Sequence, residues 1–213
     1  MILKVCEIFA SIQGESSFAG YPCVFIRLTG CNLRCTYCDT TYAYEEGTDM
    51  EIADLVKRAT AFGIDLVEVT GGEPLLQDDV HELIDRLLSA GKNVLLETNG
   101  SVSIEGIDDR VSIVLDIKTP SSGMSEKMIM GNLDHLRKKD DVKFVISDKR
   151  DYEWAIEMIS SYDLYGRCNV LLSPAHGSLE PSMLSKWMVE DRSKARLNLQ
   201  LHKVIYGDDA RGV

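Results

Sequence analysis

Short apolar runs alternate along the chain with longer segments whose apolar residues recur every three or four positions. An apolar run of strand length is typical of a buried strand, and the longer spacing is typical of an amphipathic helix. The first residues of the chain also alternate in a strand-like manner. The later runs predict strands at Cys23–Leu28, Leu66–Thr70, Asn93–Glu97, Val111–Asp116, Val142–Ile146, Asn169–Leu172 and Leu197–Tyr206.

Helices are predicted between most of these strands. A capping box at Thr48–Glu51 is expected to begin the first helix, and Gly91 is expected at the C-cap of the second. The segment 98–110 is short for a crossover and is expected to hold no more than a turn of helix. The predicted helices are Ile52–Phe62, Val80–Leu88, about Ser125–Lys138, Tyr152–Ser161 and about Glu180–Lys194.

The alternation of strands and helices predicts an α/β fold with a parallel sheet. A closed eight-stranded barrel typically takes about 250 residues, whereas this chain has 213 and roughly six strand–helix repeats. Two architectures fit: an incomplete TIM-type barrel of about six βα units, parallel strands inside and helices outside, or a doubly wound sheet. No linker or break in composition divides the chain, so one domain over residues 1–213 is expected.

Composition narrows the class of function. The chain has 23 Lys and Arg against 34 Asp and Glu, for a formal net charge of −11. This acidity argues against non-specific binding to nucleic acid, which depends on cations that neutralise phosphates. No apolar run approaches the roughly 20 residues of a membrane span, and the N-terminus lacks the features of a signal peptide. We therefore expect a cytoplasmic protein that binds neither membranes nor nucleic acid.

The spacing of the cysteines indicates a metal centre. A structural zinc site usually needs four ligands, and no second closely spaced pair is present. Three thiolates in one loop instead suit a [4Fe–4S] cluster with one open iron, because electron-transfer clusters take four cysteines. The isolated cysteines are expected to be small core residues. The cluster candidates are Cys31, Cys35 and Cys38, and the isolated ones are Cys6, Cys23 and Cys168.

The segment Cys31-x₃-Cys35-x₂-Cys38, with Tyr37 before the last cysteine, resembles the signature of radical S-adenosylmethionine (SAM) enzymes. The resemblance favours the partial barrel over the doubly wound sheet. It also implies that SAM chelates the open iron and is cleaved to a 5′-deoxyadenosyl radical, which abstracts a hydrogen atom from the substrate. The cofactor then carries the difficult chemistry, and the protein positions it.

Polar residues and glycines follow the predicted strands, where active sites of parallel sheets form. Thr70-Gly-Gly-Glu-Pro74 resembles the GGEP motif of the same family, which implies that the backbone of Gly72 approaches SAM and that Glu73 supports the site. Taken alone, the paired glycines would be an ordinary turn. By the same resemblance, the SAM-binding residues are Tyr37, Asp39, Gly72, Glu73, Asn99, Asp116, Lys118, Ser173 and His176.

A narrower resemblance covers nearly the whole chain. The segment EIFASIQGESSFAGYPCVFIRLTGCNLRCTYCDTTYA, together with TGGEP, LLETNG and LQLHKVIYGDDARGV, resembles the 7-carboxy-7-deazaguanine synthases of queuosine and 7-deazapurine biosynthesis. The resemblance implies a radical ring contraction of 6-carboxy-5,6,7,8-tetrahydropterin to 7-carboxy-7-deazaguanine, with loss of ammonia. It further implies Mg²⁺ at Thr40, a homodimer and a flavodoxin-like reductant. A hydroxyl alone is a poor magnesium ligand, so substrate oxygens and water would supply the rest.

The chemistry of such a substrate agrees with the candidate residues. Arg27 offers bidentate geometry for the carboxylate of a pterin, and Glu15 and Glu97 can accept its 2-amino and N3–H donors. The resemblance implies that the N-terminal segment 1–22 and the tail 197–213, including the terminal carboxylate, complete the site. The substrate-binding candidates are Ile12, Gln13, Gly14, Glu15, Arg27, Thr70, Glu97, His202 and Val213.

Two alternatives remain at the level of the sequence. Asp116-Ile-Lys118 differs from the Ser-Pro-Lys of some synthases and also resembles glycyl-radical activating enzymes, which act on a protein glycine. A non-enzymatic iron–sulfur or zinc module is the other. It predicts neither an open iron nor SAM turnover.

Overall fold

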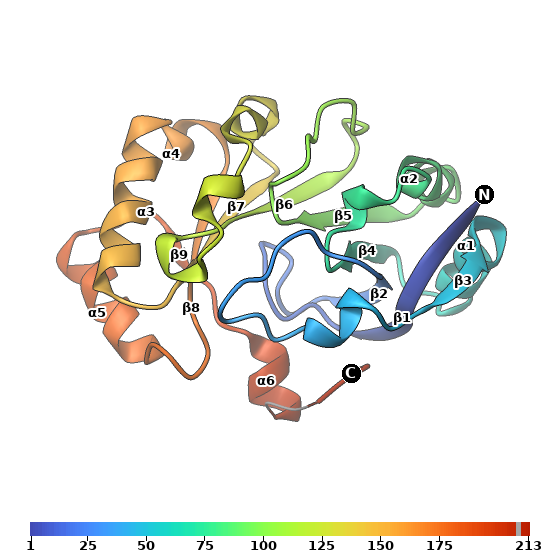
Figure 1. The fold of residues 1–213 in the computed structure, drawn as a ribbon, viewed down its shortest axis with the longest axis horizontal. Coiled ribbons are helices and arrows are strands. Elements are labelled where there is room, and N and C mark those ends of the chain that lie inside the picture. Colours follow the sequence, from blue (N-terminus) through green and yellow to red (C-terminus); the bar gives the residue numbers. More distant parts are fainter. Residues whose placement is uncertain (208–209) are drawn as a thin grey trace.

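The computed structural model describes residues 1–207 and 210–213. Its strands form one sheet in the order β3-β1-β2-β4-β5-β6-β7-β8-β9 (Figure 1). Strand β1 runs antiparallel to β2 and β3, and every other pairing is parallel. The strands are β1 Ile2–Ile12, β2 Pro22–Leu28, β3 Thr48–Glu51, β4 Leu66–Gly71, β5 Asn93–Thr98, β6 Ser112–Ile117, β7 Asp141–Ile146, β8 Asn169–Pro174 and β9 Arg196–Leu197.

Helices cover the outer face of this sheet. In Figure 1, α1 and α2 lie toward the end that carries the N-terminus, and α3, α4 and α5 lie toward the other end. The buried stripes of these helices join the strands in one large apolar core. No helix in the described residues has the length and apolar character of a membrane span. The helices are α1 Ile52–Ala61, α2 Val80–Ser89, α3 Lys149–Ser161, α4 Leu164–Arg167, α5 Pro181–Glu190 and α6 Leu201–Tyr206.

This architecture confirms the predicted partial barrel. Seven consecutive strands, β2 and β4 to β9, are parallel, and the strand order ends at β3 and β9 without closing. The helices predicted at 52–62, 80–88, 152–161 and 180–194 are present with shifted ends. Gly91 directly follows the C-cap of α2 with a φ of 77°, and segment 98–110 contains no helix.

The inner face of the sheet has two layers, and this layering positions the site. A small apolar cluster of Cys23, Leu66, Leu95 and Val114 forms a floor. Side chains two residues apart on a strand point to the same face. The residue two positions beyond each of three floor residues is charged, and these charged residues are Glu68, Glu97 and Asp116.

The predicted capping box at Thr48–Glu51 is wrong. These residues form β3, with Thr48 opposite Val5 of β1 and Glu51 opposite Ile2. Glu51 still occupies the N-cap of α1, but it makes no side-chain capping bond there. Backbone pairing with a long neighbouring strand satisfies more donors and acceptors than one cap can.

The predicted helix at 125–138 is also wrong, because the segment forms only short 3₁₀ turns. Buried Asn132 explains this. Its side chain donates to the carbonyls of Gly100 and Val102 at 3.2 and 2.8 Å and accepts the Ile104 amide at 3.1 Å. These bonds tie the segment to the preceding loop, in place of the backbone bonds of a helix.

The last predicted strand, Leu197–Tyr206, is wrong except at Leu197, which is the second residue of β9, and α6 occupies Leu201–Tyr206. Asn198 makes the last contacts with β8: its amide donates to the Leu172 carbonyl and its side chain donates to Ser173 Oγ, both within 2.9 Å. The Leu201 amide then donates to the Gly14 carbonyl at 2.9 Å. The chain therefore leaves the sheet and turns toward the N-terminal segment.

One cysteine prediction needs correction. Cys23 and Cys168 are buried as expected, but Cys6 is only half-buried. It sits at the register shift between Val5 and Glu7 in β1, and its Sγ lies 3.7 Å from Arg211 Nη2. A bulge re-aims a side chain away from the regular alternation, so Cys6 faces the C-terminal tail and not the core.

Candidate active site

A cavity of about 450 Å³ opens at the carboxyl ends of the parallel strands. Its walls come from the strand ends, the loop after β2, the segment after β1 and the last residues of the chain. Cavities of this size enclose small-molecule ligands and cofactors. All the candidate iron–sulfur, magnesium, substrate and SAM residues except Glu73 line this one cavity.

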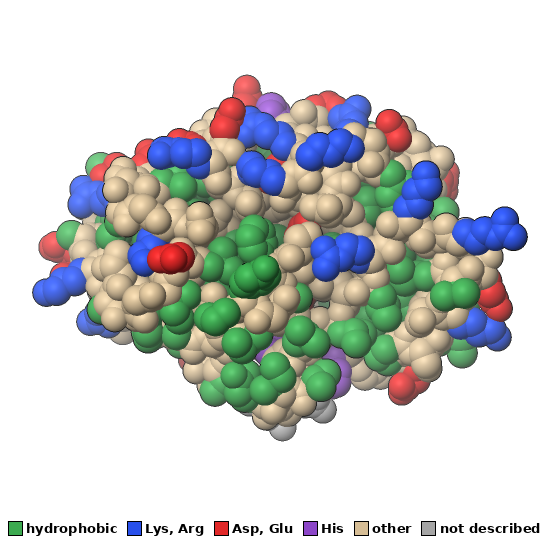
Figure 2. Space-filling view, turned by 180° about the vertical axis from the view of Figure 1, so that it is seen from behind, with side chains coloured by type: hydrophobic (Ala, Val, Ile, Leu, Met, Phe, Trp, Pro, Cys, Tyr) green, Lys and Arg blue, Asp and Glu red, His purple; other side chains and the backbone are tan. Residues whose placement is uncertain are grey.

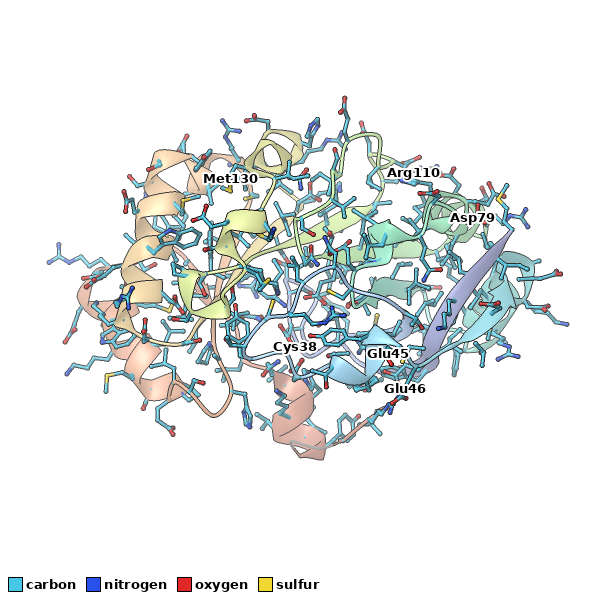
Figure 3. All side chains as sticks on the ribbon, viewed as in Figure 1. Cys38, Glu45, Glu46, Asp79, Arg110 and Met130 are labelled. Atoms are coloured by element: carbon cyan, nitrogen blue, oxygen red, sulfur yellow. The ribbon has the colours of Figure 1, made fainter. Side chains whose placement is uncertain are left out.

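The loop after β2 carries the three closely spaced cysteines. Their thiols are free, half-buried and part of the cavity wall, and Cys38 lies in front of the sheet in Figure 3. The Thr36 hydroxyl anchors the loop by donating to the Ser121 carbonyl at 2.7 Å. The Leu33 amide points at Cys31 Sγ at 3.4 Å. Hydrogen bonds to sulfur are one of the means by which proteins tune iron–sulfur clusters.

The turn after β4 brings Gly72 against the cysteine loop. The Gly72 amide donates to the Leu28 carbonyl at 3.3 Å. A β-carbon at Gly72 would lie 2.2 Å from the Gly30 carbonyl oxygen and 2.7 Å from the β-carbon of Cys31. Only glycine therefore lets this turn pack so closely on the loop.

Glu73 lies behind the residues that line the cavity and holds two of the strand ends together by hydrogen bonds. It is fully buried, outside the cavity lining, and accepts hydrogen bonds from the Asn99 amide at 2.7 Å, the Thr98 hydroxyl at 2.9 Å and the Leu75 amide at 3.0 Å. Burial raises the pKa of Glu73 above its ordinary value. Glu73 thus connects the turn after β4 to the end of β5, where Asn99 faces the cavity.

Asp116 and Lys118 form an ion pair at 3.0 Å, with only 10% and 13% of their side chains exposed. A solvated surface pair, the ordinary interpretation of such a sequence, is excluded by this burial. Burial alone would raise the pKa of Asp116, but Lys118 and Lys143 hold it below its ordinary value. Asp116 Oδ1 is buried and has no hydrogen-bond partner in the described part of the chain. A buried acceptor without a partner in a cavity wall indicates a place for a ligand donor.

Lys143, on β7, connects this pair to the substrate candidates. Its Nζ lies 2.9 Å from Glu15 Oε2 and 3.2 Å from Asp116 Oδ2, and it also contacts Glu97 Oε1. Burial would raise the pKa of Glu15, but the Lys143 ammonium outweighs burial and holds that pKa below its ordinary value. Three carboxylates of the cavity wall are therefore held around the Lys143 ammonium.

Thr40 and Asp39 lie together at the cavity wall. The Thr40 hydroxyl donates to Asp39 Oδ1 at 3.0 Å, and the other carboxylate oxygen receives Lys203 Nζ at 2.9 Å and Gln200 Nε2 at 3.2 Å. Although burial opposes it, the hydrogen bond from Lys203 keeps the pKa of Asp39 below its ordinary value. Over residues 1–207 and 210–213, no three His, Cys, Asp or Glu side chains are grouped so that they could hold a single metal ion, and this includes the three cysteines of the loop, which are candidate ligands of a larger cluster.

Comparison with known proteins decides the family. The model of the radical SAM superfamily matches residues 25–167. The 7-carboxy-7-deazaguanine synthase of Chlorobaculum tepidum is 46% identical, over 99% of this chain and 97% of that protein. The synthase of Koribacter versatilis is 40% identical, over 99% and 100% of the two chains. The chain belongs to the 7-carboxy-7-deazaguanine synthase family of the radical SAM superfamily.

The solved structures agree with the fold of this family. The crystal structure of QueE from Escherichia coli superposes with a TM-score of 0.78 over 94% of both chains, at 22% identity. A structure of TYW1 with a lysine-pyruvate adduct bound reaches a TM-score of 0.59 over 81% of this chain and 74% of that one, at 13% identity. Membership confirms the resemblance that the motifs indicated.

A radical SAM synthase uses a [4Fe–4S] cluster and SAM, and the residues of this cavity fit both. Three free thiols in one loop leave one iron of a four-iron cluster without a protein ligand. Gly72, which packs closely on Cys31, and Asp116, whose Oδ1 has no hydrogen-bond partner in the described residues, both line the cavity beside that loop. The donor set therefore suits a cluster that is completed by a small molecule.

A buried glutamate, Glu68, lies on β4 next to Gln13 in the cavity. Glu68, on β4, is 2% exposed and accepts a hydrogen bond from the Gln13 side chain, whose Oε1 in turn accepts the Glu15 amide. Burial, and then the negative charge of Glu97, raise the pKa of Glu68 well above its ordinary value. Glu68 therefore holds its proton to a higher pH than an exposed glutamate would, and its carboxyl orients Gln13.

We expect stability to depend on pH through Glu68. Because its pKa is higher in the folded chain than in the unfolded chain, its proton stabilises the fold at low pH. This contribution declines as the pH rises above the ordinary value of 4.5. In Glu68→Gln, which is always neutral, the decline should disappear. Thermal unfolding of both proteins at several pH values from about 5 to about 8 measures this decline in stability. Parallel pH profiles of the two proteins would contradict a raised pKa of Glu68.

The segment after β1 and the C-terminal segment both pack at the cavity. A β-carbon at Gly14 would lie 2.3 Å from His202 Nδ1, so the segment after β1 packs directly on α6. Further along, Arg211 contacts Glu46 at 2.6 Å and stacks 3.7 Å from the centre of the Tyr42 ring. Glu46 is labelled beside the C-terminal segment in Figure 3. These contacts hold residues 210–213 against the cavity wall.

Sequence reasoning missed several residues of this site. Lys143 and Glu68 were hidden inside apolar strands, and a charge within such a run was the available signal. Glu7 was also missed; its Oε1 accepts Arg27 Nε at 2.7 Å and the Tyr42 hydroxyl at 3.0 Å. Nothing local in the sequence marks the other two, Gln200 and Lys203, although the tail 197–213 to which they belong was expected to complete the site.

Proposed function

We propose that this chain converts 6-carboxy-5,6,7,8-tetrahydropterin to 7-carboxy-7-deazaguanine with loss of ammonia. The observation that carries the proposal is a single cavity that joins a loop of three free cysteines to a cation–carboxylate cluster. When bound, the cluster and SAM supply the radical hydrogen abstraction that starts the ring contraction. Relatives with the synthase name and 40–46% identity over nearly the full length support it.

On the cofactor side, we assign the cysteines as ligands of the cluster and the strand ends around them as the SAM site. The Gly72 turn and Asn99 lie next to Cys31, since Asn99 Nδ2 is 3.7 Å from its sulfur. The Asp116–Lys118 pair offers one free acceptor and one cation. The remaining proposed SAM contacts are Tyr37, Asp39, Ser173 and His176, with Glu73 acting through Asn99.

On the substrate side, Arg27 is proposed to bind the pterin carboxylate. Glu7 accepts its Nε, which leaves the terminal nitrogens of the guanidinium for a ligand. Glu15 and Glu97 are proposed to accept from the amino edge. Thr40 is proposed to hold Mg²⁺ together with substrate oxygens, consistent with a hard ion. The other proposed contacts are Ile12, Gln13, Gly14, Thr70, His202 and Val213.

The proposal also includes the organisation of the protein. One domain over residues 1–213, completed by segments 1–22 and 197–213, is supported by the single sheet and by the contact of Gly14 with α6. A homodimer is supported by the exposed apolar side chains of Val204, Ile205 and Tyr206. Figure 2 shows hydrophobic side chains gathered at the lower middle of the rear face, where α6 projects. A flavodoxin-like reductant and a cytoplasmic location follow the family; free thiols suit a reducing compartment.

Anaerobic reconstitution with iron and sulfide, followed by assay with SAM, a reductant and the carboxytetrahydropterin, tests the proposal. The expected products are 7-carboxy-7-deazaguanine and ammonia. Deoxyadenosine without deazaguanine would instead favour the activation of a protein glycine. A single zinc per chain without SAM binding would favour the non-enzymatic module.

An extension at the C-terminus should weaken substrate binding. Val213 lines the cavity, and a peptide added there removes its terminal carboxylate. Loss of a hydrogen bond to a charged group typically costs about 1.5–3 kcal/mol, so KM should rise roughly ten- to a hundredfold. Steady-state kinetics with a short C-terminal tag measures this. The same tag at Met1, which is 67% exposed, is the control; equal KM values for the two proteins would remove the terminal carboxylate from the site.

A further inference from the structure

Lys143 is a buried cation that none of the roles above requires. Only 6% of its side chain is exposed, although it lines the cavity. Its ammonium is shared by the carboxylates of Glu15, Glu97 and Asp116, which come from the segment after β1 and from β5 and β6. It therefore connects the proposed substrate pair with the proposed SAM contact Asp116.

Glu15 and Glu97 each keep a carboxylate oxygen that can accept a hydrogen bond from a ligand. Lys143 donates to one oxygen of Glu15, and among the described residues the other oxygen accepts only Gln200 Nε2, at 3.1 Å. Lys143 likewise donates to Oε1 of Glu97, and within residues 1–207 and 210–213 the other oxygen, Oε2, has only a long contact of 3.4 Å with the Thr70 hydroxyl. A carboxylate oxygen can accept more than one hydrogen bond. Both carboxylates are therefore fixed by a cation on one side and open on the other.

We propose that Lys143 is the positioning residue that makes the Glu15–Glu97 pair select a ligand edge of N–H donors over one with a carbonyl. The inference rests on the proposed function, since it assigns the amino edge of the pterin to this pair. Two carboxylates that both pair with the Lys143 ammonium accept hydrogen bonds and offer no hydrogen of their own, so a carbonyl facing them would find no donor. Sites built to hydrogen-bond one edge can reject an analogue by as much as 10⁴–10⁵-fold.

Removal of the Lys143 ammonium should leave the Glu15–Glu97 pair with one hydrogen-bond donor in addition to its acceptors. Without Lys143, Glu15 and Glu97 lie close together in a largely desolvated wall, and like charges in such a site share a proton. A protonated carboxyl donates as well as accepts. The cavity would then accommodate a carbonyl, and its preference for the amino edge would fall.

The matched ligands are 6-carboxypterin and 6-carboxylumazine, which differ by a 2-amino against a 2-oxo group. Equilibrium binding of each to the reconstituted, SAM-loaded protein is compared for wild type, Lys143→Met and Lys143→Arg. We expect the preference for the amino ligand to fall at least about tenfold in Lys143→Met, by loss of one bond to a charged group. Lys143→Arg keeps the charge and should retain most of the preference. Iron content and SAM binding are measured for every variant.

Lys92→Met is the control for removal of a buried lysine. The Lys92 side chain is 11% exposed, lies 3.6 Å from Asp65 and donates to the Ile64 carbonyl at the opposite end of the strands. It should keep the wild-type preference. If Lys143→Met does not fold, the comparison of Lys143→Arg with the wild type still tests the proposal. Loss of the preference for 6-carboxypterin in Lys143→Arg overturns it.

The outcomes separate this inference from the proposed function. Unchanged preference in a folded Lys143→Met protein overturns the inference. Wild-type protein that makes deazaguanine but binds both ligands equally also overturns the inference alone. Wild-type protein that prefers 6-carboxypterin but makes no deazaguanine overturns the proposed function and leaves the assignment of Lys143 supported.

Discussion

Replacement of Cys35 by alanine is expected to abolish assembly of the cluster. Cys35 is one of three free thiols in the loop after β2, and no other cysteine lines the cavity to replace it. Losing a hydrogen-bonding partner of a metal ligand typically costs 10–100-fold in affinity, and losing the ligand itself should cost at least as much. Reconstituted iron should therefore fall at least about tenfold, together with the visible absorbance of the cluster and all SAM cleavage.

The matched control is Cys168→Ala. Cys168 is 7% exposed and packs in the apolar core, with its Sγ 3.6 Å from the Leu164 carbonyl. Its replacement removes a small apolar group and should lower stability modestly, while iron content stays at the wild-type level. Wild-type iron in Cys35→Ala, or equal losses in both variants, would contradict the assignment of the three-cysteine loop.

Gly72→Ala should inactivate the enzyme through displacement of backbone. The added β-carbon would lie 2.2 Å from the Gly30 carbonyl oxygen and 2.8 Å from its carbonyl carbon. Neither atom can rotate away, so the turn or the cysteine loop must move. A misplacement of about 1 Å can cost on the order of 10²-fold in rate, and overpacking typically costs about 1–3 kcal/mol in stability. Product formation by reconstituted protein and thermal unfolding measure the two effects.

Gly131→Ala is the control for this change. Gly131 lies in the 3₁₀ segment Met130–His135, its φ is not positive, and a β-carbon there meets nothing within 4 Å. Activity and thermal stability should both stay near wild type. If Gly72→Ala retained full activity as well, close approach of this turn to the cysteine loop would not be needed for the reaction.

Local sequence patterns were sufficient for the sheet and for the cysteine loop. Strand periodicity located β2 and β4 to β8, because buried parallel strands are continuous apolar runs. The capping signal at Thr48 and the apolar spacing of 125–138 failed, since pairing with β1 and the side chain of Asn132 supplied other hydrogen bonds. Such partners lie far away in the chain and leave no local trace.

By itself, the sequence determined strands β2 and β4 to β8, helices α1, α2, α3 and α5, the three-cysteine loop and the polar residues at the strand ends, since each depends on spacing between near neighbours. Only the tertiary structure brought Lys143 to Glu15, 128 residues away, removed Glu73 from the cavity wall, and folded α6 and Arg211 back onto the N-terminal segment. The register of adjacent strands and the path of the tail decide these contacts. They are set by packing over the whole sheet, and therefore the charge balance of the site became visible only in the fold.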